Sequence, residues 1–88
     1  MAHSKGAVLL VDDERVARTV ATRMLERLGF EVDATADGEE ALEVFSRAPA
    51  RYVGVLLDLT MPRMDGDACL REIRRIRPDV PVVLSAPG

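Results

Sequence analysis

The chain has 88 residues, of which 48% are hydrophobic and 31% charged, a balance typical of one small globular domain. Aromatic residues make up only 3% and the net charge is −3, so direct nucleic-acid binding is not expected. No apolar run approaches the roughly 20 residues of a membrane span and no stretch has the pattern of a secretory signal, so we expect no membrane insertion.

The first six residues, "MAHSKG", lack periodicity, and we expect a disordered leader or tag remnant over residues 1–6 and a domain over residues 7–88. The one histidine, His3, lies in this leader, so histidine catalysis is not expected. Cys69 is the one cysteine, which excludes an internal disulfide and fits a reducing compartment. A cytoplasmic location is therefore predicted.

The first two elements are a buried strand and a helix. Ala7–Val11 ("AVLLV") is a short, continuous apolar run, typical of a strand buried on both faces of a parallel sheet. A helix is predicted over residues 14–28, because apolar residues recur every four positions and would form its buried stripe. The stripe consists of Val16, Val20, Met24 and Leu28, widened by Ala17 and Leu25. Gly29 suits the position that follows a helix C-terminus.

Residues 30–36 ("FEVDATA") alternate between apolar and polar, which predicts a strand with an exposed face. Asp37 is the expected N-cap of a second helix, and Glu40 three residues later makes the pair a relative of the capping box. The buried side of this helix is predicted to carry Ala41, Leu42 and Phe45, and Pro49 ends it.

Residues 52–57 form the third predicted strand, and a third helix begins at Asp65 or Gly66 and stops at Pro78. Leu70, Ile73 and Ile76 are predicted to face inward, and residues 80–84 ("VPVVL") form a fourth strand. Strands that alternate with helices predict an α/β fold, a doubly wound parallel sheet with right-handed crossovers. In such sheets the functional crevice lies beyond the carboxyl ends of the strands.

Acidic residues stand at these strand ends. Asp12 and Asp13 follow the first strand, and Asp58 follows the third. The two strands should be neighbours, so the carboxylates converge and repel one another unless a cation neutralises them. Carboxylates, a backbone carbonyl and water are ligands that suit Mg²⁺. Asp12 or Asp13 alone could instead cap a helix, and Asp58 alone could form a turn.

Three segments together resemble the receiver domain of bacterial two-component response regulators. They are "VLLVDDE" (8–14), "LLDLTMPRMDG" (56–66) and "VPVVLSA" (80–86). The resemblance covers nearly all of residues 7–86 and implies a flavodoxin-like fold and a phosphorelay function. It implies a signalling phosphoacceptor rather than an enzyme, one that at most assists its own phosphorylation and dephosphorylation.

The resemblance implies a role for each matching residue. Asp58 would accept a phosphoryl group from a histidine kinase or a histidine phosphotransfer protein. Asp13 and Asp58 would bind Mg²⁺ directly, Asp12 mainly through water, and Thr60 through its backbone carbonyl. The side chain of Thr60 would tune the access of hydrolytic water.

The same resemblance extends to the switch and to the loop after Asp58. Ser85 would be the switch hydroxyl that hydrogen-bonds the phosphoryl group, joined by the backbone N–H of Ala86. Pro62 and Gly66 would shape the loop that leads into the third helix.

Receiver domains have five strands and five helices, with a lysine at the end of the fifth strand. The sequence printed here ends after its fourth strand, and its one lysine is Lys5, so we expect a C-terminally truncated, incomplete receiver domain that lacks the last helix, strand and helix. The fourth strand and the uncovered sheet faces would then favour a homodimer or higher oligomer. Phosphorylation of this form is expected to be impaired.

Two other functions fit part of the pattern. A Mg²⁺-dependent phosphatase of the aspartyl-phosphate type also places an aspartate after a strand, but it typically has a second aspartate two residues later, where this chain has Thr60. A non-signalling fragment or engineered assembly piece could retain the acidic pocket without using it.

Overall fold

The computed structural model describes residues 4–58 and 66–85. Four parallel strands form one sheet in the order β2-β1-β3-β4. The strands are β1 (Ala7–Val11), β2 (Glu31–Thr35), β3 (Tyr52–Asp58) and β4 (Val82–Ser85). The helices are α1 (Arg15–Arg27), α2 (Gly38–Arg47), the short 3₁₀ helix η1 (Pro49–Arg51) and α3 (Gly66–Ile76). The predicted doubly wound α/β fold is confirmed, and β1 and β3 are neighbours as expected.

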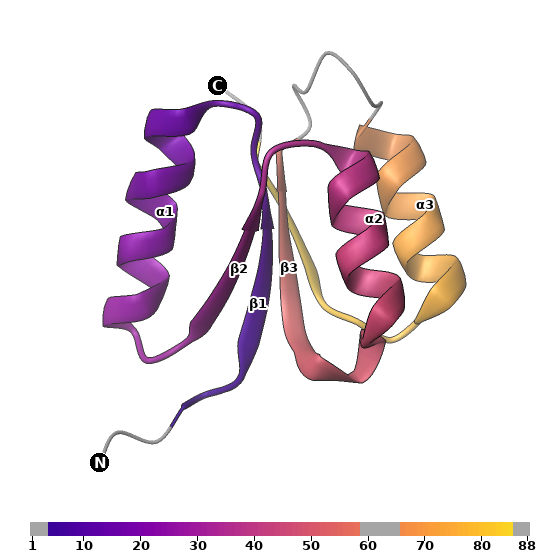
Figure 1. Ribbon diagram of the computed structural model, residues 1–88. Coiled ribbons are helices and arrows are strands. Elements are labelled where there is room, and N and C mark those ends of the chain that lie inside the picture. The colour runs from indigo at the N-terminus through magenta and orange to yellow at the C-terminus, as the bar shows by residue number, and fades with distance from the viewer. Residues whose placement is uncertain (1–3, 59–65, 86–88) are drawn as a thin grey trace.

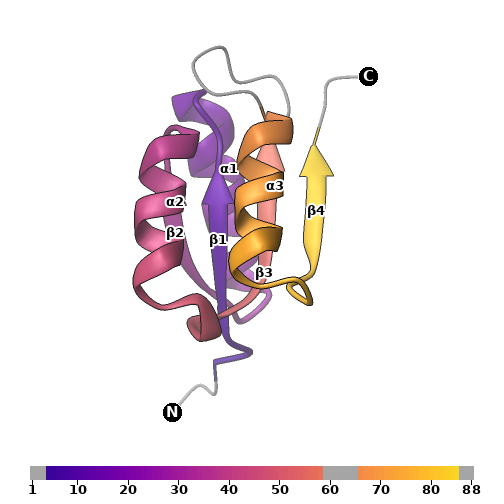
Figure 2. The same cartoon turned by 90° about the vertical axis from the view of Figure 1, so that its right-hand side faces the viewer.

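The helices cover the two faces of the sheet unequally. In the described residues, α2 and α3 lie side by side on one face and α1 lies alone on the other (Figures 1 and 2). The core lies under α2 and α3, where Leu9, Phe45 and Ile73 are fully buried. Cys69 is also fully buried there, and burial raises the pKa of its thiol to about 11. Burial and the raised pKa both disfavour the reactive thiolate form.

Local signals at the helix ends are confirmed. Asp37 accepts a hydrogen bond from the N–H of Glu40 (2.8 Å), which confirms it as the N-cap of α2. The Glu40 carboxylate accepts one from the N–H of Ala36 (2.9 Å), one residue before the N-cap, so the pair is a variant of the capping box. Gly29 follows α1 with φ of +100°, and its N–H donates to the carbonyl of Glu26. This left-handed residue ends α1 and turns the chain into β2.

The predicted stripe of α1 is wrong. Val16, Val20, Met24 and Leu28 are 51–69% exposed, and α1 has no buried residue. Ala17 and Leu25 are half-buried. One helix alone on a sheet face packs along a single side, so the rest of its apolar residues remain in solvent.

The bounds of β2, β3 and β4 also differ from the prediction by one or two residues. Strand β4 begins at Val82 rather than at residue 80, although Val80 is buried in the core. Pro81 has no N–H to donate, and its carbonyl accepts a hydrogen bond from the N–H of Val55 (2.9 Å), so regular pairing starts after it. Strand β3 extends through Asp58.

The leader predicted over residues 1–6 is described from Ser4 onward. The N–H of Lys5 donates to the carbonyl of Gly29, and the carbonyl of Gly6 accepts from the N–H of Glu31. No described helix has the length and apolar character needed to cross a membrane.

A polar cluster joins β2 to η1 and the start of β3. The Tyr52 hydroxyl donates to the Asp33 carboxylate at 2.6 Å, and the Arg51 Nε donates to the same oxygen at 3.0 Å. Burial of the phenol, strengthened by the nearby Asp33 carboxylate, raises the pKa of Tyr52 to about 12. The hydrogen bonds from Arg51 and Tyr52 lower the pKa of Asp33.

Tyr52 is the only tyrosine and the chain has no tryptophan, so phenolate absorbance reports on this residue alone. We expect a midpoint near pH 12 in the wild type and a lower midpoint in Asp33→Asn, which removes the neighbouring charge. Because the folded chain holds this proton more tightly than the unfolded chain, the stability from Tyr52 is present below about pH 10 and declines toward pH 12. A midpoint unchanged by Asp33→Asn, with Glu31→Gln as the control, would contradict the role of the cluster.

Candidate functional site

The candidate site lies at the carboxyl ends of the central strands. Asp12 and Asp13 follow β1, and Asp58 is the last residue of the neighbouring β3. One carboxylate oxygen from each of the three residues lies within 4.8 Å of the other two. The predicted convergence of these three side chains is therefore what the structure shows.

The three carboxylates differ in exposure and in partners. Asp12 and Asp58 are half-buried and Asp13 is exposed. One carboxylate oxygen of Asp12 accepts a hydrogen bond from the N–H of Glu14 at 2.9 Å. Burial raises the pKa of Asp12, opposed by this hydrogen bond and reinforced by the charges of Asp58 and Asp13. The site is a patch of crowded negative charge that a cation would relieve.

Strand β4 adds a hydroxyl to the same edge. Asp58 and Ser85 are partners in the parallel pairing of β3 with β4, so their Cα atoms stand side by side. Ser85 is exposed. Together with Asp12 and Asp58 it lines a groove of about 340 Å³ between the sheet and α1. Apolar residues such as Leu10 and Met24 line the same groove.

Some predicted site residues fall outside the described part of the chain. Thr60, Pro62 and Ala86 are among them, as are residues 59–65 in general. Gly66 is described: it is buried and is the first residue of α3.

Two residues that support the site were not predicted from the sequence. Thr35 is a buried polar residue at the end of β2; its hydroxyl donates to the carbonyl of Leu10 at 2.8 Å, and its carbonyl accepts from the N–H of Asp12 at 3.1 Å. Arg18, in the second turn of α1, donates from Nη1 to the carbonyl of Asp12 at 2.9 Å. The sequence signal that could have identified Thr35 is a polar residue at the end of an edge strand. The sequence gives no such signal for Arg18, because it looks like the solvent-facing arginines of the same helix.

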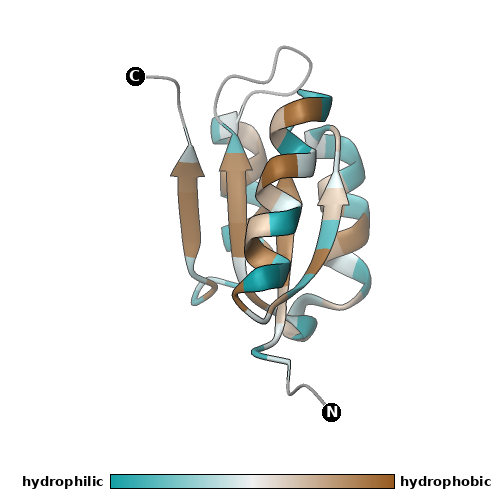
Figure 3. Cartoon of the chain, turned by 90° about the vertical axis from the view of Figure 1, so that its left-hand side faces the viewer, coloured by the Kyte–Doolittle hydropathy of each residue, from teal (hydrophilic) through white to brown (hydrophobic). Residues whose placement is uncertain are grey.

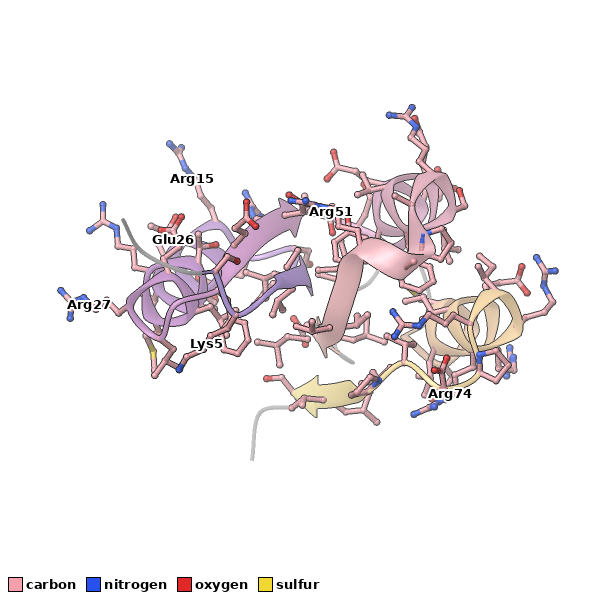
Figure 4. The ribbon with its side chains drawn as sticks, turned by 90° about the horizontal axis from the view of Figure 1, so that it is seen from below. Lys5, Arg15, Glu26, Arg27, Arg51 and Arg74 are labelled. Carbon is pink, nitrogen blue, oxygen red and sulfur yellow. The ribbon has the colours of Figure 1, made fainter. Side chains whose placement is uncertain are left out.

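The donor set fits a hard divalent cation. Three carboxylate oxygens gathered at one edge are the ligand type that Mg²⁺ takes, with remaining positions available for water or a substrate oxygen. Lys5 lies near the opposite ends of the strands, with its Nζ 5.9 Å from the centre of the Phe30 ring (Figure 4). It does not neutralise this cluster.

Comparisons with known proteins agree with this geometry. A sequence model of the family described as "Response regulator receiver domain" matches residues 8–86. The "Probable transcriptional regulator ycf27" of Porphyridium aerugineum is 39% identical over 80 residues, which are 91% of this chain and 32% of that protein. The chain thus spans about a third of the length of that regulator.

Solved structures share the fold. A response regulator receiver domain protein from Clostridium thermocellum superimposes with a TM-score of 0.88 at 30% identity, covering 92% of this chain and 64% of that one. The receiver domain of the histidine kinase CKI1 from Arabidopsis thaliana, solved with Mg²⁺ and BeF₃⁻, gives a TM-score of 0.87 at 29% identity, covering 97% of this chain and 70% of that one.

Repulsion among the three carboxylates can be tested in the absence of any ligand. Asp58→Asn removes one of three mutually repelling charges, so we expect it to raise the free energy of unfolding in metal-free buffer by on the order of 1 kcal/mol. The gain should shrink as salt screens the repulsion. Denaturant titration measures both effects, with Glu26→Gln on the exposed side of α1 as the charge-matched control. A destabilised Asp58→Asn in metal-free buffer would show that repulsion is not the dominant interaction.

Proposed function

The chain belongs to the response regulator receiver domain family of two-component signal transduction, and from this premise we propose that Asp58 accepts a phosphoryl group in a Mg²⁺-dependent phosphorelay. Receiver domains are signalling phosphoacceptors, not classical enzymes. The observation that carries the proposal is the convergence of Asp12, Asp13 and Asp58 at the ends of two adjacent parallel strands. The donor would be a phosphohistidine of a kinase or phosphotransfer protein, and the setting the cytoplasm.

The reaction requires little of the protein beyond positioning and charge. A carboxylate oxygen of Asp58 attacks phosphorus, a P–O bond forms, the P–N bond to the histidine ring breaks, and its electron pair remains on the ring nitrogen. Asp58 ends a paired strand, which fixes its backbone at the crevice. Bound Mg²⁺ would supply positive charge to the carboxylates and to the phosphoryl oxygens.

The remaining roles are those that membership of the receiver-domain family implies for the matching residues. Asp13 and Asp58 would bind the ion directly and Asp12 mainly through water, while Thr60 would add its backbone carbonyl. Ser85, paired with Asp58 in the β3–β4 ladder, would donate its hydroxyl to the phosphoryl group. The family also implies a contribution from the backbone N–H of Ala86, which lies outside the described residues. Such a bond forms only after phosphorylation, which is how a local charge can bias a loop.

Self-association is the second part of the proposal. Strand β4 is an edge of the sheet, and its Val83 and Leu84 are 62% and 46% exposed. Figure 3 shows apolar β3 and β4 beside α1 on the sheet face that α1 only partly covers. A groove of about 520 Å³ on this face is lined mostly by apolar side chains, among them Val8 and Val53. We propose that a second copy covers this face in the 88-residue chain.

Phosphorylation is tested with acetyl phosphate and Mg²⁺, read out by mass spectrometry. We expect labelling at Asp58 that is abolished in Asp58→Asn and by chelation of Mg²⁺. For the 88-residue chain it should be slow and substoichiometric, because its one lysine lies away from the cluster. Labelling that survives Asp58→Asn or chelation would overturn the phosphoacceptor role, whereas rapid, complete labelling would overturn only the expectation of impairment.

Self-association is tested by sedimentation velocity at micromolar concentration. We expect dimers or larger species for the wild type and a shift toward monomer in Val83→Lys, which places a charge on the exposed edge strand. Ser46→Lys, on the exposed surface of α2, is the matched control and should leave the distribution unchanged. A wild type that is a compact, cooperatively folding monomer would contradict the proposal.

A further inference from the structure

Asp12 is held in place by hydrogen bonds from three separate segments. Its N–H donates to the carbonyl of Thr35 in β2, at 3.1 Å. Its carboxylate accepts from the N–H of Glu14 in the loop before α1, at 2.9 Å. Its carbonyl accepts from the guanidinium of Arg18 in α1, at 2.9 Å. These bonds connect Asp12, one of the three carboxylate residues, to β2, to the loop before α1 and to α1 itself.

Arg18 differs from the other arginines of its helix. It is half-buried, whereas Arg15, Arg23 and Arg27 are exposed. Figure 4 shows Arg15 and Arg27 extending away from the body of the protein. The Arg18 side chain instead turns back over the first turn of α1 to reach a carbonyl six residues earlier.

Helix α1 has few other attachments to the acidic edge. It has no buried residue, its N-cap Glu14 makes no side-chain capping hydrogen bond, and its first turn contains no acidic residue. Packing and capping therefore contribute less to its placement than they do for α2. A side-chain hydrogen bond between α1 and the end of β1 is then a substantial part of what fixes the loop between them.

We propose that Arg18 is a positioning residue for the Mg²⁺ site: through the carbonyl of Asp12 it holds the loop that aims Asp12 and Asp13 at Asp58. This inference rests on the proposed function. Two effects of Arg18 oppose each other, because its positive charge disfavours a nearby cation while its hydrogen bond orders the ligands. The direction of the change in Mg²⁺ affinity on removing Arg18 distinguishes them. If positioning dominates, the Mg²⁺ affinity falls, and if charge repulsion dominates, it rises.

The experiment compares Arg18→Met with Arg23→Met by calorimetric titration with Mg²⁺, at a temperature where both are folded by circular dichroism. Each variant removes one arginine charge from α1, but only the first removes the hydrogen bond to Asp12. We expect about tenfold weaker Mg²⁺ binding in Arg18→Met, as for outer-shell partners of metal ligands, and wild-type binding in Arg23→Met. The carbonyl ¹³C resonance of Asp12 should shift in Arg18→Met alone.

Arg18→Lys keeps the charge and can restore a donor to the carbonyl. We expect its Mg²⁺ affinity to lie between those of the wild type and Arg18→Met, and to follow the Asp12 carbonyl shift. Should Arg18→Met fail to fold, Arg18→Lys decides the question. A displaced Asp12 carbonyl resonance, which reports loss of the hydrogen bond, together with wild-type Mg²⁺ affinity would overturn the inference. Unchanged or tighter binding in a folded Arg18→Met also overturns it, without affecting the proposed function. A wild type that binds no Mg²⁺ would overturn both.

Discussion

The parallel pairing of β1 with β3 is the constraint on which the site depends. Val11 pairs with Leu57, so the residues that follow them, Asp12 and Asp58, lie at the same end of the sheet. Pairing of β3 with β4 then places Ser85 beside Asp58. Backbone hydrogen bonds thus assemble carboxylates and a hydroxyl from three distant parts of the sequence. The carboxylates repel one another, and the same crowded negative charge attracts a cation.

The two faces of the sheet have different roles in stability. Leu9, Phe45 and Ile73 are buried between the sheet and the pair α2 and α3, and this side holds the core. The other face is covered by α1 alone in the described residues, and large apolar side chains there remain exposed. The cluster of Asp12, Asp13 and Asp58 lies where this thinly covered face meets the carboxyl ends of the strands. The proposed cation site and the proposed interface with a second copy are therefore close together.

The sequence was sufficient to predict features that depend on local chemistry. The N-cap at Asp37, the left-handed Gly29 and the buried run of β1 follow from residue type and spacing. Adjacency of β1 and β3 followed from the rules of parallel sheets, and it was enough to bring Asp12 and Asp58 together.

What could not be predicted depends on tertiary surroundings. Periodicity along α1 identified apolar positions such as Val16 and Met24, but it could not reveal that only one side of the helix has a partner. Thr35 and Arg18 act through backbone carbonyls of other elements, and such contacts leave no pattern in the sequence. The predicted roles of Thr60, Pro62 and Ala86 remain predictions, since these residues lie outside the described part of the chain.

The central claim is that the carboxyl ends of β1 and β3 form a divalent-cation site, and paramagnetic broadening by substoichiometric Mn²⁺ tests it most directly. In ¹H–¹⁵N spectra of the 88-residue chain, the amide signals of Asp12, Asp13, Asp58 and Ser85 should broaden first, and competing Mg²⁺ should restore them. Broadening centred instead on Glu39, Glu43 and other exposed acidic residues of α2, or spread evenly over the acidic surface, would contradict the account.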